Sequence, residues 1–560
     1  MSGKPWVRGS RGLIGILVLV QWLTVATPAP AQPPSGSIER ELGFLEAEDV
    51  AKIPVTVASR GPAIPAGQAP AVVDVITSEE IRTSGARTLA ELLEQRVGID
   101  VAINRVVPRG LNTAPSQGLA LFNNRTLLLI DGRPTNGVFF GEFLPGREFP
   151  LEHIARIEVI RGPGSSLYGT NALAGVINIV TKDAADSSGI TAIGQGGTQS
   201  TRRFDLLGGA GGPRLNGNFF LHHFGSGGAN ELNRNDNLRT LYAFGRSTVG
   251  PVTLEAEAMS FSQEIPGTED NETPADRINR ERYSIGASLL QPIGEEFQLA
   301  GRAYANVHQT RILVLASDID RRKYEEHRFG QELSLNYRPT DWLAITFGGE
   351  IREEGGEVGP LGCVREASGG LESDPAGCDL DQNVYAFFVE DQIGLPWDLT
   401  LSAGVRWDKV TITNDDRWSP RVNLLWRPSD ATSIKVGYGE AFRAPSFFEL
   451  RGAQRLGATS VIVGNPNLGS EVVRTVDGEI AHRFSRALNL RLGGFYTRGS
   501  DLITQQTDSQ LIGLDLDLLG ILFGDPLFTP ILQRRFSFIN SDSVTVSGVE
   551  GAVGGVLELP

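Results

Sequence analysis

From about residue 188 onward, the chain alternates strictly between apolar residues and polar or small ones. In 399–407, for example, Leu, Leu, Ala, Val and Trp alternate with Thr, Ser, Gly and Arg. The same alternation recurs in 343–351, 434–438 and 488–496. A period of two is typical of β-strands with one apolar face. It predicts about sixteen strands between residue 188 and the last residue.

The connections between these strands alternate in length. Short turns are predicted at 291–296, 338–341, 395–398, 427–432 and 483–487. Long polar loops are predicted between them, at 262–281, 309–324, 353–383, 409–418, 441–472 and 500–537. Short turns at one end and long loops at the other are typical of outer-membrane β-barrels. No fixed-period repeat is visible, which argues against a β-propeller.

Residues 72–182 follow a different pattern, which predicts a compact α/β unit. Strands are predicted at 72–76, 127–130, 154–160 and 176–180. Thr77 or Ser78 is suited to cap a short helix, and a second helix is predicted over 88–96. A barrel of about sixteen strands encloses a lumen of channel size. We therefore expect this unit to plug the lumen.

The N-terminus has the three parts of a signal peptide. Lys4, Arg8 and Arg11 precede an apolar run at 13–23, and the small-residue site Ala29-Pro30-Ala31 follows. The run is too short to cross ~30 Å of hydrocarbon as a helix. We therefore expect export, with cleavage after Ala31.

Composition narrows the classes of function. Of 560 residues, 40% are hydrophobic, and the net charge of −15 disfavours a nucleic-acid partner. With 6 His and 2 Cys, we expect no metal site and no cofactor. No GxSxG, HExxH or P-loop pattern is present, so we expect no catalytic residues and no enzyme activity. Cys363 and Cys378 meet an oxidising compartment after export, and we expect them to form a disulfide.

Several segments carry a family resemblance. They are Val72–Thr77, Glu80–Arg82, Leu89–Leu93, Arg109-Gly110, Leu129–Arg133, Ile154–Pro163, Ser166–Gly169 and Ala174–Ile179, followed later by Phe442–Pro445 and Asn465–Leu468. In this order they resemble the TonB-dependent outer-membrane receptors. The resemblance covers about 50 to 560, which is nearly the whole mature chain.

The resemblance implies an all-β transmembrane barrel with an N-terminal α/β plug domain, in the outer membrane of a Gram-negative bacterium. We place the signal peptide at 1–31, a periplasmic extension at 32–71, the plug at 72–183 and the barrel at 188–560. Barrels of the family close with about 22 strands, and about sixteen are predicted here. We therefore expect the chain to be a C-terminally truncated fragment.

The same resemblance implies a set of residues that fix the plug in the barrel. Charged members of the set are expected to pair with the barrel wall, and glycines to allow tight packing. They are Arg109, Gly110, Asp131, Gly132, Arg156, Glu158, Arg161, Gly162, Tyr168, Gly169, Gly175 and Asn178.

The family takes energy from the inner-membrane protein TonB through a short segment ahead of the plug, the TonB box. The candidate here is Ile53-Pro54-Val55-Thr56-Val57, a β-prone stretch between polar flanks. Such a stretch is suited to pair with a partner's strand. An ordinary extended linker is the alternative for this segment, and Phe44-Leu45-Glu46 is a second candidate for the box.

The ligand implied by the resemblance is a small molecule, with a ferric siderophore as the leading class. Candidate contacts are Arg105, Asn136, Phe139 and Phe140 on the plug apex and Arg322 and Arg451 in outer loops. Aromatic rings suit an aryl-bearing ligand and arginines suit an anionic one. The alternative for the rings is packing against the barrel wall, and for the loop arginines a solvated loop or lipopolysaccharide contact.

Other functions remain as alternatives. A cobalamin or haem receptor has the same fold, and a passive porin-like channel would conduct without energy. Haem ligation is disfavoured because no His lies between the FRAP and NPNL segments, in 446–464. Besides TonB and the ligand, we expect contact with outer-membrane lipid, no nucleic acid, and a monomer.

Overall fold

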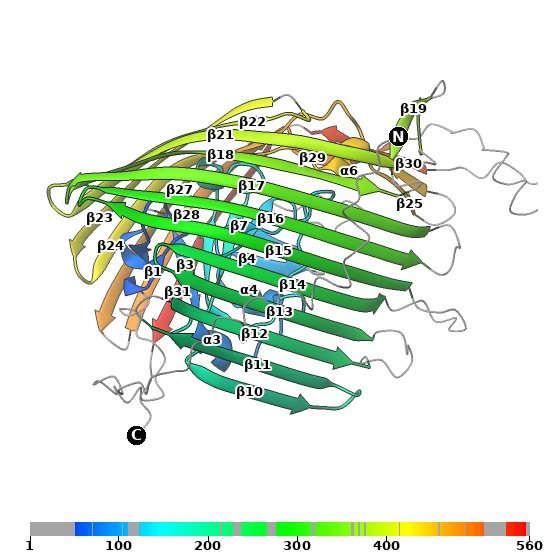
Figure 1. Cartoon of the computed structure of the whole chain (residues 1–560). Coiled ribbons are helices and arrows are strands. Elements are labelled where there is room, and N and C mark those ends of the chain that lie inside the picture. Colours follow the sequence, from blue (N-terminus) through cyan, green and yellow to red (C-terminus); the bar gives the residue numbers. More distant parts are fainter. Residues whose placement is uncertain are drawn as a thin grey trace, which may run out of the picture.

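The structure, a computed structural model, describes most of the chain after residue 50. The described residues are 51–69, 71–102, 105–109, 123–212, 215–227, 237–265, 276–314, 320–359, 363–367, 370–373, 377–413, 415–456, 460–485, 488–508, 534–541 and 543–555. The predicted signal peptide lies outside them. Figure 1 shows a broad curved sheet with the N-terminal elements, in blue and cyan, against its concave side.

Among the described residues, the large sheet has 16 strands, and each neighbouring pair along it is antiparallel. In order they are β10 (Gly189–Gly196), β11 (Arg202–Gly211), β12 (Leu215–Ser226), β13 (Leu238–Val249), β14 (Val252–Ile265), β15 (Asp276–Ile293), β16 (Phe297–Val314), β17 (Asp320–Thr340), β18 (Leu343–Val358), β21 (Cys378–Leu395), β22 (Leu399–Val410), β23 (Asp415–Ser429), β24 (Thr432–Arg443), β27 (Glu471–Ser485), β28 (Leu488–Ser500) and β31 (Val544–Gly555). The predicted barrel sheet is confirmed.

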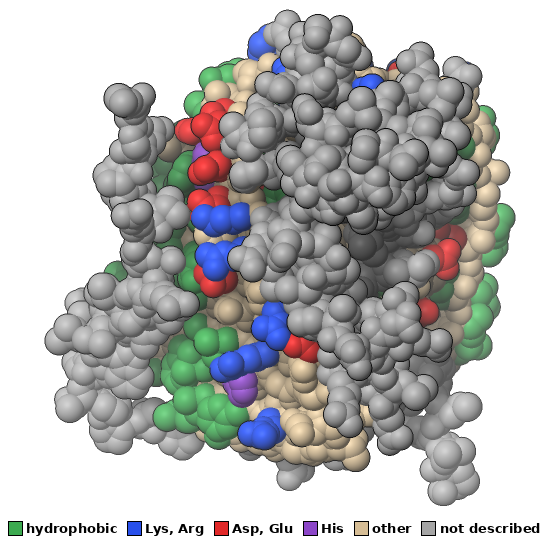
Figure 2. All heavy atoms as spheres, turned by 90° about the vertical axis from the view of Figure 1, so that its right-hand side faces the viewer, with side chains coloured by type: hydrophobic (Ala, Val, Ile, Leu, Met, Phe, Trp, Pro, Cys, Tyr) green, Lys and Arg blue, Asp and Glu red, His purple; other side chains and the backbone are tan. Residues whose placement is uncertain are grey.

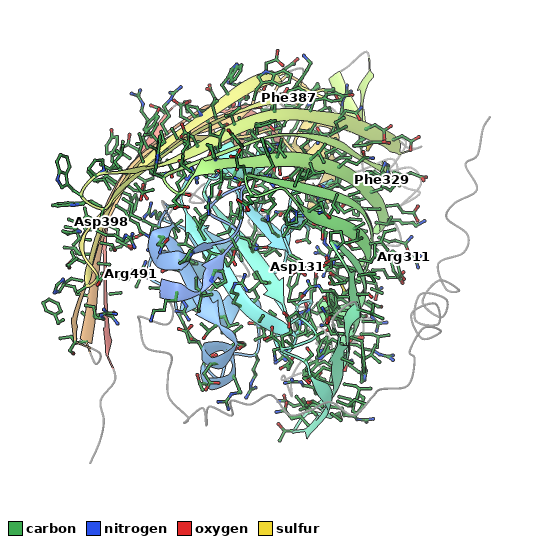
Figure 3. The ribbon with its side chains drawn as sticks, turned by 60° about the vertical axis from the view of Figure 1, so that its left-hand side comes forward. Asp131, Arg311, Phe329, Phe387, Asp398 and Arg491 are labelled. Atoms are coloured by element: carbon green, nitrogen blue, oxygen red, sulfur yellow. A yellow bond between two sulfur atoms is a disulfide. The ribbon has the colours of Figure 1, made fainter. Side chains whose placement is uncertain are left out.

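The alternating sequence pattern corresponds to the two faces of this sheet. On β21, Phe387 is 66% exposed on the convex face, whereas Phe388 is 3% exposed and faces the plug. Figure 3 shows Phe329 and Phe387 on the convex side of the wall. On β22, Arg406 and Asp408 are fully buried on the concave face. Apolar residues therefore point outward and charged residues inward, which is the reverse of a soluble β-sandwich.

The short turns that the structure describes fall where the sequence predicts them, but two predicted long loops, 309–324 and 409–418, are mostly strand. β16 continues to Val314 and β17 begins at Asp320, so most of the predicted loop 309–324 is strand. These ends of the strands extend beyond an apolar environment, so their sequence no longer alternates between apolar and polar residues. The pattern that predicts strands is therefore missing there. Arg311 and Lys323 are paired opposite each other on these polar strand ends.

The plug is built on a sheet in the order β3-β8-β9-β6-β7. Its strands are β3 (Val73–Thr77), β8 (Ile154–Arg161), β9 (Gly175–Thr181), β6 (Thr126–Ile130) and β7 (Arg133–Pro134). The other plug elements are β1 (Pro54–Val55), β2 (Ile64–Pro65), η2 (Ala66–Gln68), α3 (Ser78–Thr83), α4 (Leu89–Glu94), β4 (Ile99–Ala102), β5 (Arg105–Pro108) and α5 (Ser165–Tyr168). Apolar side chains of α3 and α4 pack on this sheet, with Leu89, Leu92 and Leu93 almost completely buried.

Local sequence signals explain where the two plug helices start. Thr77 and Glu80 form a reciprocal capping box at the start of α3. Thr88 accepts a hydrogen bond from the backbone of Glu91 at the start of α4. Both caps satisfy amide groups that the first helical turn leaves without a partner.

Smaller elements gather at the end of the barrel that carries the long connections. They are β19 (Val364–Ala367), β20 (Gly370–Ser373), α6 (Phe447–Arg451), β25 (Ala453–Leu456), β26 (Ser460–Val463), β29 (Ile503–Asp508) and β30 (Arg534–Asn540). β25, β26, β30 and β29 form a sheet of their own. A disulfide joins Cys363 to Cys378, with a Cα–Cα distance of 6.1 Å. In the described part of the chain, no helix is both long and apolar enough to cross a bilayer.

Candidate functional site

The plug apex is covered in this structure. Phe139 and Phe140 are 2% and 8% exposed. The ring of Phe139 lies 4.9 Å from Tyr324 of β17, and that of Phe140 lies 4.9 Å from Phe448 of α6. Of the two interpretations of these rings, the structure shows the alternative, packing against the barrel, and not exposure to a ligand. They pack against barrel residues because the outer segments fold back over the apex.

Backbone contacts strengthen this cover. The amide groups of Val138 and Phe139 donate to the Glu326 carboxylate at 2.8 and 3.1 Å. The amide of Phe448 donates to the carbonyl of Phe139 at 2.8 Å. The cavity beneath, lined in part by Arg328 and Gln382, holds about 30 Å³. Small-molecule pockets are usually about 300 Å³ or larger, so this cavity is too small to hold such a ligand.

The remaining predicted ligand contacts lie in different environments in the structure. Asn136 is fully buried and bonds the backbone of Thr126, Leu128 and Gly141, so it shapes the apex hairpin and is not open to a ligand. Arg451 is exposed at the end of α6. Arg105 lies in β5 and Arg322 in β17, but their side chains lie outside the described residues. Figure 2 views this end of the molecule, where basic and acidic side chains alternate on the described surface.

Arg443 of the FRAP segment centres an ion-pair network under the cover. Arg443 donates to Glu449 of α6 at 2.7 Å and to Glu471 of β27 at 2.6 Å. Arg125 of the plug reaches the same Glu471 at 2.5 Å. All four side chains are at least nine-tenths buried. The network ties α6, two barrel strands and the plug together. Sequence reasoning missed it, because only the fold brings Arg125 beside these motifs.

A second group of ion pairs fastens the lower plug to β27, β28 and β31. Arg109 lies 3.2 Å from Asp477 and 3.0 Å from Glu550. Arg161 lies 2.6 Å from Glu550 and 2.9 Å from Asp74 of the plug. Gly110, next in the chain, lies outside the described residues.

Two further contacts come from turns of the plug. Asp131 pairs with Arg246 of β13 at 2.7 Å, and the Gly132 carbonyl accepts from Arg302 of β16 at 2.8 Å. Gly132 has a φ of +75°, and a Cβ there would lie 2.8 Å from the Arg302 guanidinium. Gly169, with a φ of +71°, similarly leaves room for Asp408 at 2.8 Å. Glycine lets the plug backbone approach the wall at both positions.

Arg156 and Glu158 do not make the expected contact with the barrel wall. Arg156 donates to Glu158 at 2.8 Å. The second oxygen of Glu158 accepts from the amides of Thr56 and Val57 at 3.0 and 2.9 Å. The physical reason is that Glu158 lies on the same face of β8 as Ile160, and Val55 and Val57 of the N-terminal segment pack on that face. Asn178 also donates to Glu158, at 3.3 Å. Gly162 follows the end of β8, and Gly175 is the first residue of β9.

The N-terminal segment 53–57 is docked on the plug. Val55 and Val57 are fully buried among plug side chains. Pro54 and Val55 pair with Ile64 and Pro65 in a short two-stranded sheet. Next along the chain, Arg60 pairs with Glu332 of the barrel at 2.9 Å. The segment therefore contacts the plug directly and is followed by an anchor on the wall.

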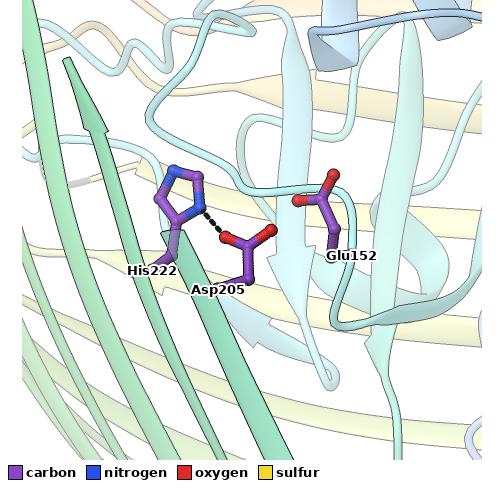
Figure 4. Close-up of side chains that lie close together, drawn as sticks. All are labelled: Glu152, Asp205 and His222. Carbon is purple, nitrogen blue, oxygen red and sulfur yellow. Dashed lines mark hydrogen bonds and ion pairs between the residues drawn. The ribbon is translucent and has the colours of Figure 1, made fainter. Parts of the chain in front are cut away.

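One group of side chains has the composition of a metal site. Figure 4 shows Glu152 of the plug beside Asp205 and His222 of the barrel, with His222 bonded to Asp205 at 2.5 Å. Arg203 pairs with both carboxylates. Its guanidinium already supplies the positive charge that a cation would bring. We therefore interpret the group as an ion-pair contact between plug and wall.

Comparison with known proteins identifies the family. The family described as "TonB dependent receptor-like, beta-barrel" matches residues 214–559, and "TonB-dependent Receptor Plug Domain" matches 65–176. The chain belongs to the TonB-dependent receptors. Its relatives and its fold are those of transport receptors and not of enzymes.

Individual relatives are distant. The ferric enterobactin receptor of Pseudomonas aeruginosa is 24% identical over 458 residues, covering 68% of this chain and 60% of that receptor. The hemin receptor of Yersinia pestis is 24% identical over 515 residues, covering 79% of this chain and 70% of that receptor. A crystal structure of a point mutant of the Pseudomonas aeruginosa ferric enterobactin receptor has a TM-score of 0.66 at 19% identity, covering 90% of this chain and 79% of that chain. The chain thus spans about three fifths of the length of the first of these relatives.

Proposed function

We propose that this protein takes up a scarce nutrient across the outer membrane with energy supplied through TonB. The observation that carries the proposal is the plug, held against the concave wall by buried ion pairs at Arg109, Arg125 and Arg161. Breaking a buried ion pair costs several kcal/mol, roughly 3–5. A plug held by several of them does not leave its place spontaneously. This favours energy-coupled transport over a passive channel.

The segment 53–57 is the proposed point of attachment for TonB. It precedes the plug, and its β-prone sequence suits pairing with a partner strand. We place it in a periplasmic extension that follows the signal peptide. We further propose that outer-membrane lipid contacts the convex face, where Phe387, Trp418 and Leu333 are at least half exposed, and that the protein is a monomer.

The proposed ligand is a ferric siderophore. One relative is named for ferric enterobactin and another for hemin. Haem is disfavoured for this chain because 446–464 contains no His. The position between the two motifs therefore lacks a nitrogen donor for the iron. Cobalamin stays as the second candidate.

A competition panel tests the ligand class. Cells in which this protein is the sole receptor of its kind would be offered radiolabelled ferric siderophores and cobalamin. We expect saturable uptake of a ferric siderophore that unlabelled cobalamin does not reduce. Uptake of cobalamin alone would contradict the proposed class. Persistent ion conductance of the purified protein in a planar bilayer would contradict a plugged receptor and favour a porin.

A further inference from the structure

The concave wall formed by β17, β18 and β22 carries a chain of ion pairs, which we call the charged ladder. Successive members lie 2.6–2.9 Å apart, and each side chain is at most 6% exposed. In order, the members are Arg328 of β17, Glu354, Arg352 and Glu350 of β18, and Arg406 and Asp408 of β22. Positive and negative side chains therefore alternate along this wall, and each buried charge has a partner.

The ladder finds its ionic partners within the barrel. It touches the plug through backbone carbonyls: Arg328 donates to Asn136 at 2.8 Å, and Arg406 donates to Leu167 at 3.4 Å. The buried ion pairs that fasten the plug to β27 and β31, in contrast, each join a plug residue to a wall residue. Movement of the plug away from β27 and β31 would leave unpaired charges buried, which is costly. Movement away from the ladder would leave all of its pairs intact.

Stability alone does not explain the ladder. Taking an ion out of water is costly, and apolar residues of similar volume often replace a buried ion pair without loss of stability. A wall that only had to pack against the plug could be apolar, as it is at Phe388 of β21. Charges that are already paired suit a wall that faces water and a polar solute once the plug has moved.

Two cavities lie against the same part of the wall, and residues of β17, β18 and β21 line both. The cavity beneath the apex cover, of about 30 Å³, includes Arg328 and Gln382 in its lining. A second cavity, of about 20 Å³, lies further along these strands toward the short turns and includes Asn336 and Gln392. Each volume is sufficient for at least one water molecule, which needs about 10–15 Å³.

A buried polar atom at each cavity lacks a protein partner. The side-chain oxygen of Gln382 in the first cavity and the hydroxyl of Ser402 in the second have no hydrogen-bond partner among the described residues. Buried polar atoms of this kind are normally satisfied by water. The boundary between plug and wall is therefore polar at both cavities, and the ladder leads from the first toward the second.

We propose that the charged ladder lines the route by which the ligand passes the plug, along β17, β18, β21 and β22. Figure 1 shows these strands side by side in the upper part of the sheet. This inference rests on the proposed function and names the side of the barrel on which the plug gives way. Arg60, ahead of the plug, separates from Glu332 of β17 when the route opens at its lower end.

The ladder also defines the chemistry of the ligand. Alternating charges offer hydrogen-bond donors and acceptors in turn, so they suit a hydrophilic molecule that carries both. A solute moves along such a surface when many weak sites hold it and no single site holds it tightly. The paired state of every ladder charge provides this, because none of them needs the solute as its partner.

Cysteine labelling during uptake tests the route. Ser402→Cys places a thiol at the second cavity, and Thr346→Cys is a second variant in the lining of the same cavity. Thr497→Cys is the matched control on β28, where the buried hydroxyl of Thr497 bonds Thr475 at 2.9 Å. Cells expressing each variant receive a small water-soluble maleimide, with and without whichever labelled siderophore or cobalamin the wild type accumulates. We expect that solute to speed labelling of Ser402→Cys and Thr346→Cys at least tenfold and to leave labelling of Thr497→Cys unchanged.

A second readout is uptake after labelling. The attached maleimide should reduce accumulation through Ser402→Cys at least tenfold while binding at the cell surface is unchanged, and it should not reduce accumulation through Thr497→Cys. Equal acceleration of labelling at both walls overturns the route, as does full accumulation through completely labelled Ser402→Cys. A wild-type protein that accumulates no member of the panel contradicts the proposed function itself. Normal wild-type accumulation with no faster labelling of any variant contradicts the route alone.

Discussion

The charge of Asp74 in the plug is stabilised by an arginine of the barrel wall, Arg491, together with Arg161 of the plug. Burial by itself would raise the pKa of Asp74, but the guanidinium groups of Arg491 and Arg161, at 2.6 and 2.9 Å, outweigh it and hold the pKa below its ordinary value. The carboxylate is therefore stabilised in its charged form. Its contribution to stability is present above the unfolded pKa and is lost as pH falls through the folded value.

Replacing Asp74 should loosen the plug. Asp74→Asn removes the negative charge between two arginines, and breaking such a buried pair costs about 3–5 kcal/mol. We expect a lower thermal transition of the purified receptor and faster proteolysis of the plug. Glu79→Gln is the control, because its partner Arg82 lies on the exposed face of α3. Equal transitions for Asp74→Asn and wild type would contradict a fastening role for Asp74.

The buried His153 makes the stability of the plug depend on pH. Burial lowers its pKa from 6.5 to about 4, and the neutral ring stacks on Phe220 at 4.8 Å. Between these two values the unfolded chain binds a proton and the folded plug does not, so stability falls as pH drops from 6.5 to about 4. The difference corresponds to about 3 kcal/mol.

The measurement is the thermal transition between pH 7 and pH 4 (roughly the window in which His153 discriminates the two states). We expect His153→Gln to flatten the pH dependence, although it lowers stability at neutral pH. His482→Gln serves as the control, since His482 bonds Thr432 on the barrel strands. A His153→Gln receptor with the full wild-type slope would show that other groups carry the dependence.

At the scale of elements, the sequence predicts the plug more completely than the outer end of the barrel. The capping residues Thr77 and Thr88 mark where α3 and α4 begin. The apolar residues of 154–160 predict β8. These signals are local. The burial of Phe139 and Phe140 depends on α6, which lies about 300 positions further along the chain. Local patterns hold no information about such a partner.

Predictions from the sequence are also wrong for charged strand ends and for charged residues of the motifs, for a related reason. The polar residues 309–314 and 320–324 are read as part of a loop, although cross-strand pairing keeps them extended. Glu158 is read as facing the wall, because the sequence shows a charge but not the neighbouring segment that satisfies it. In both cases the environment of the side chain, and not its type, decides the structure.

The link between α6 and the plug can be tested at Arg443. Arg443→Met leaves Glu449 and Glu471 buried with one cation fewer, and we expect a loss of about 3–5 kcal/mol. Arg474→Met is a matched control on the next strand, since Arg474 also pairs with a glutamate, Glu440, but is 54% exposed. The readout is the thermal transition together with proteolysis within 444–470. If the two variants behave alike, burial of the network does not hold α6 in place.

At the scale of the whole molecule, the described sheet curves around a plug that contacts it on several sides. The plug touches β13 through Asp131, β27 through Arg125, and β31 through Arg109 and Arg161. Figure 3 shows Asp131 in the plug and Arg491 on the opposite wall. In the proposed function, force on the plug opens this arrangement, and segment 53–57 is the proposed point where the force is applied.

The most direct test compares binding with uptake in cells that express the protein with and without residues 53–57. The deletion should leave binding of the labelled ferric siderophore at the cell surface unchanged and abolish its accumulation inside. Substituting Ile53 alone by Val keeps the β-prone character and should preserve both. Undiminished accumulation after the deletion would contradict energy coupling through this segment.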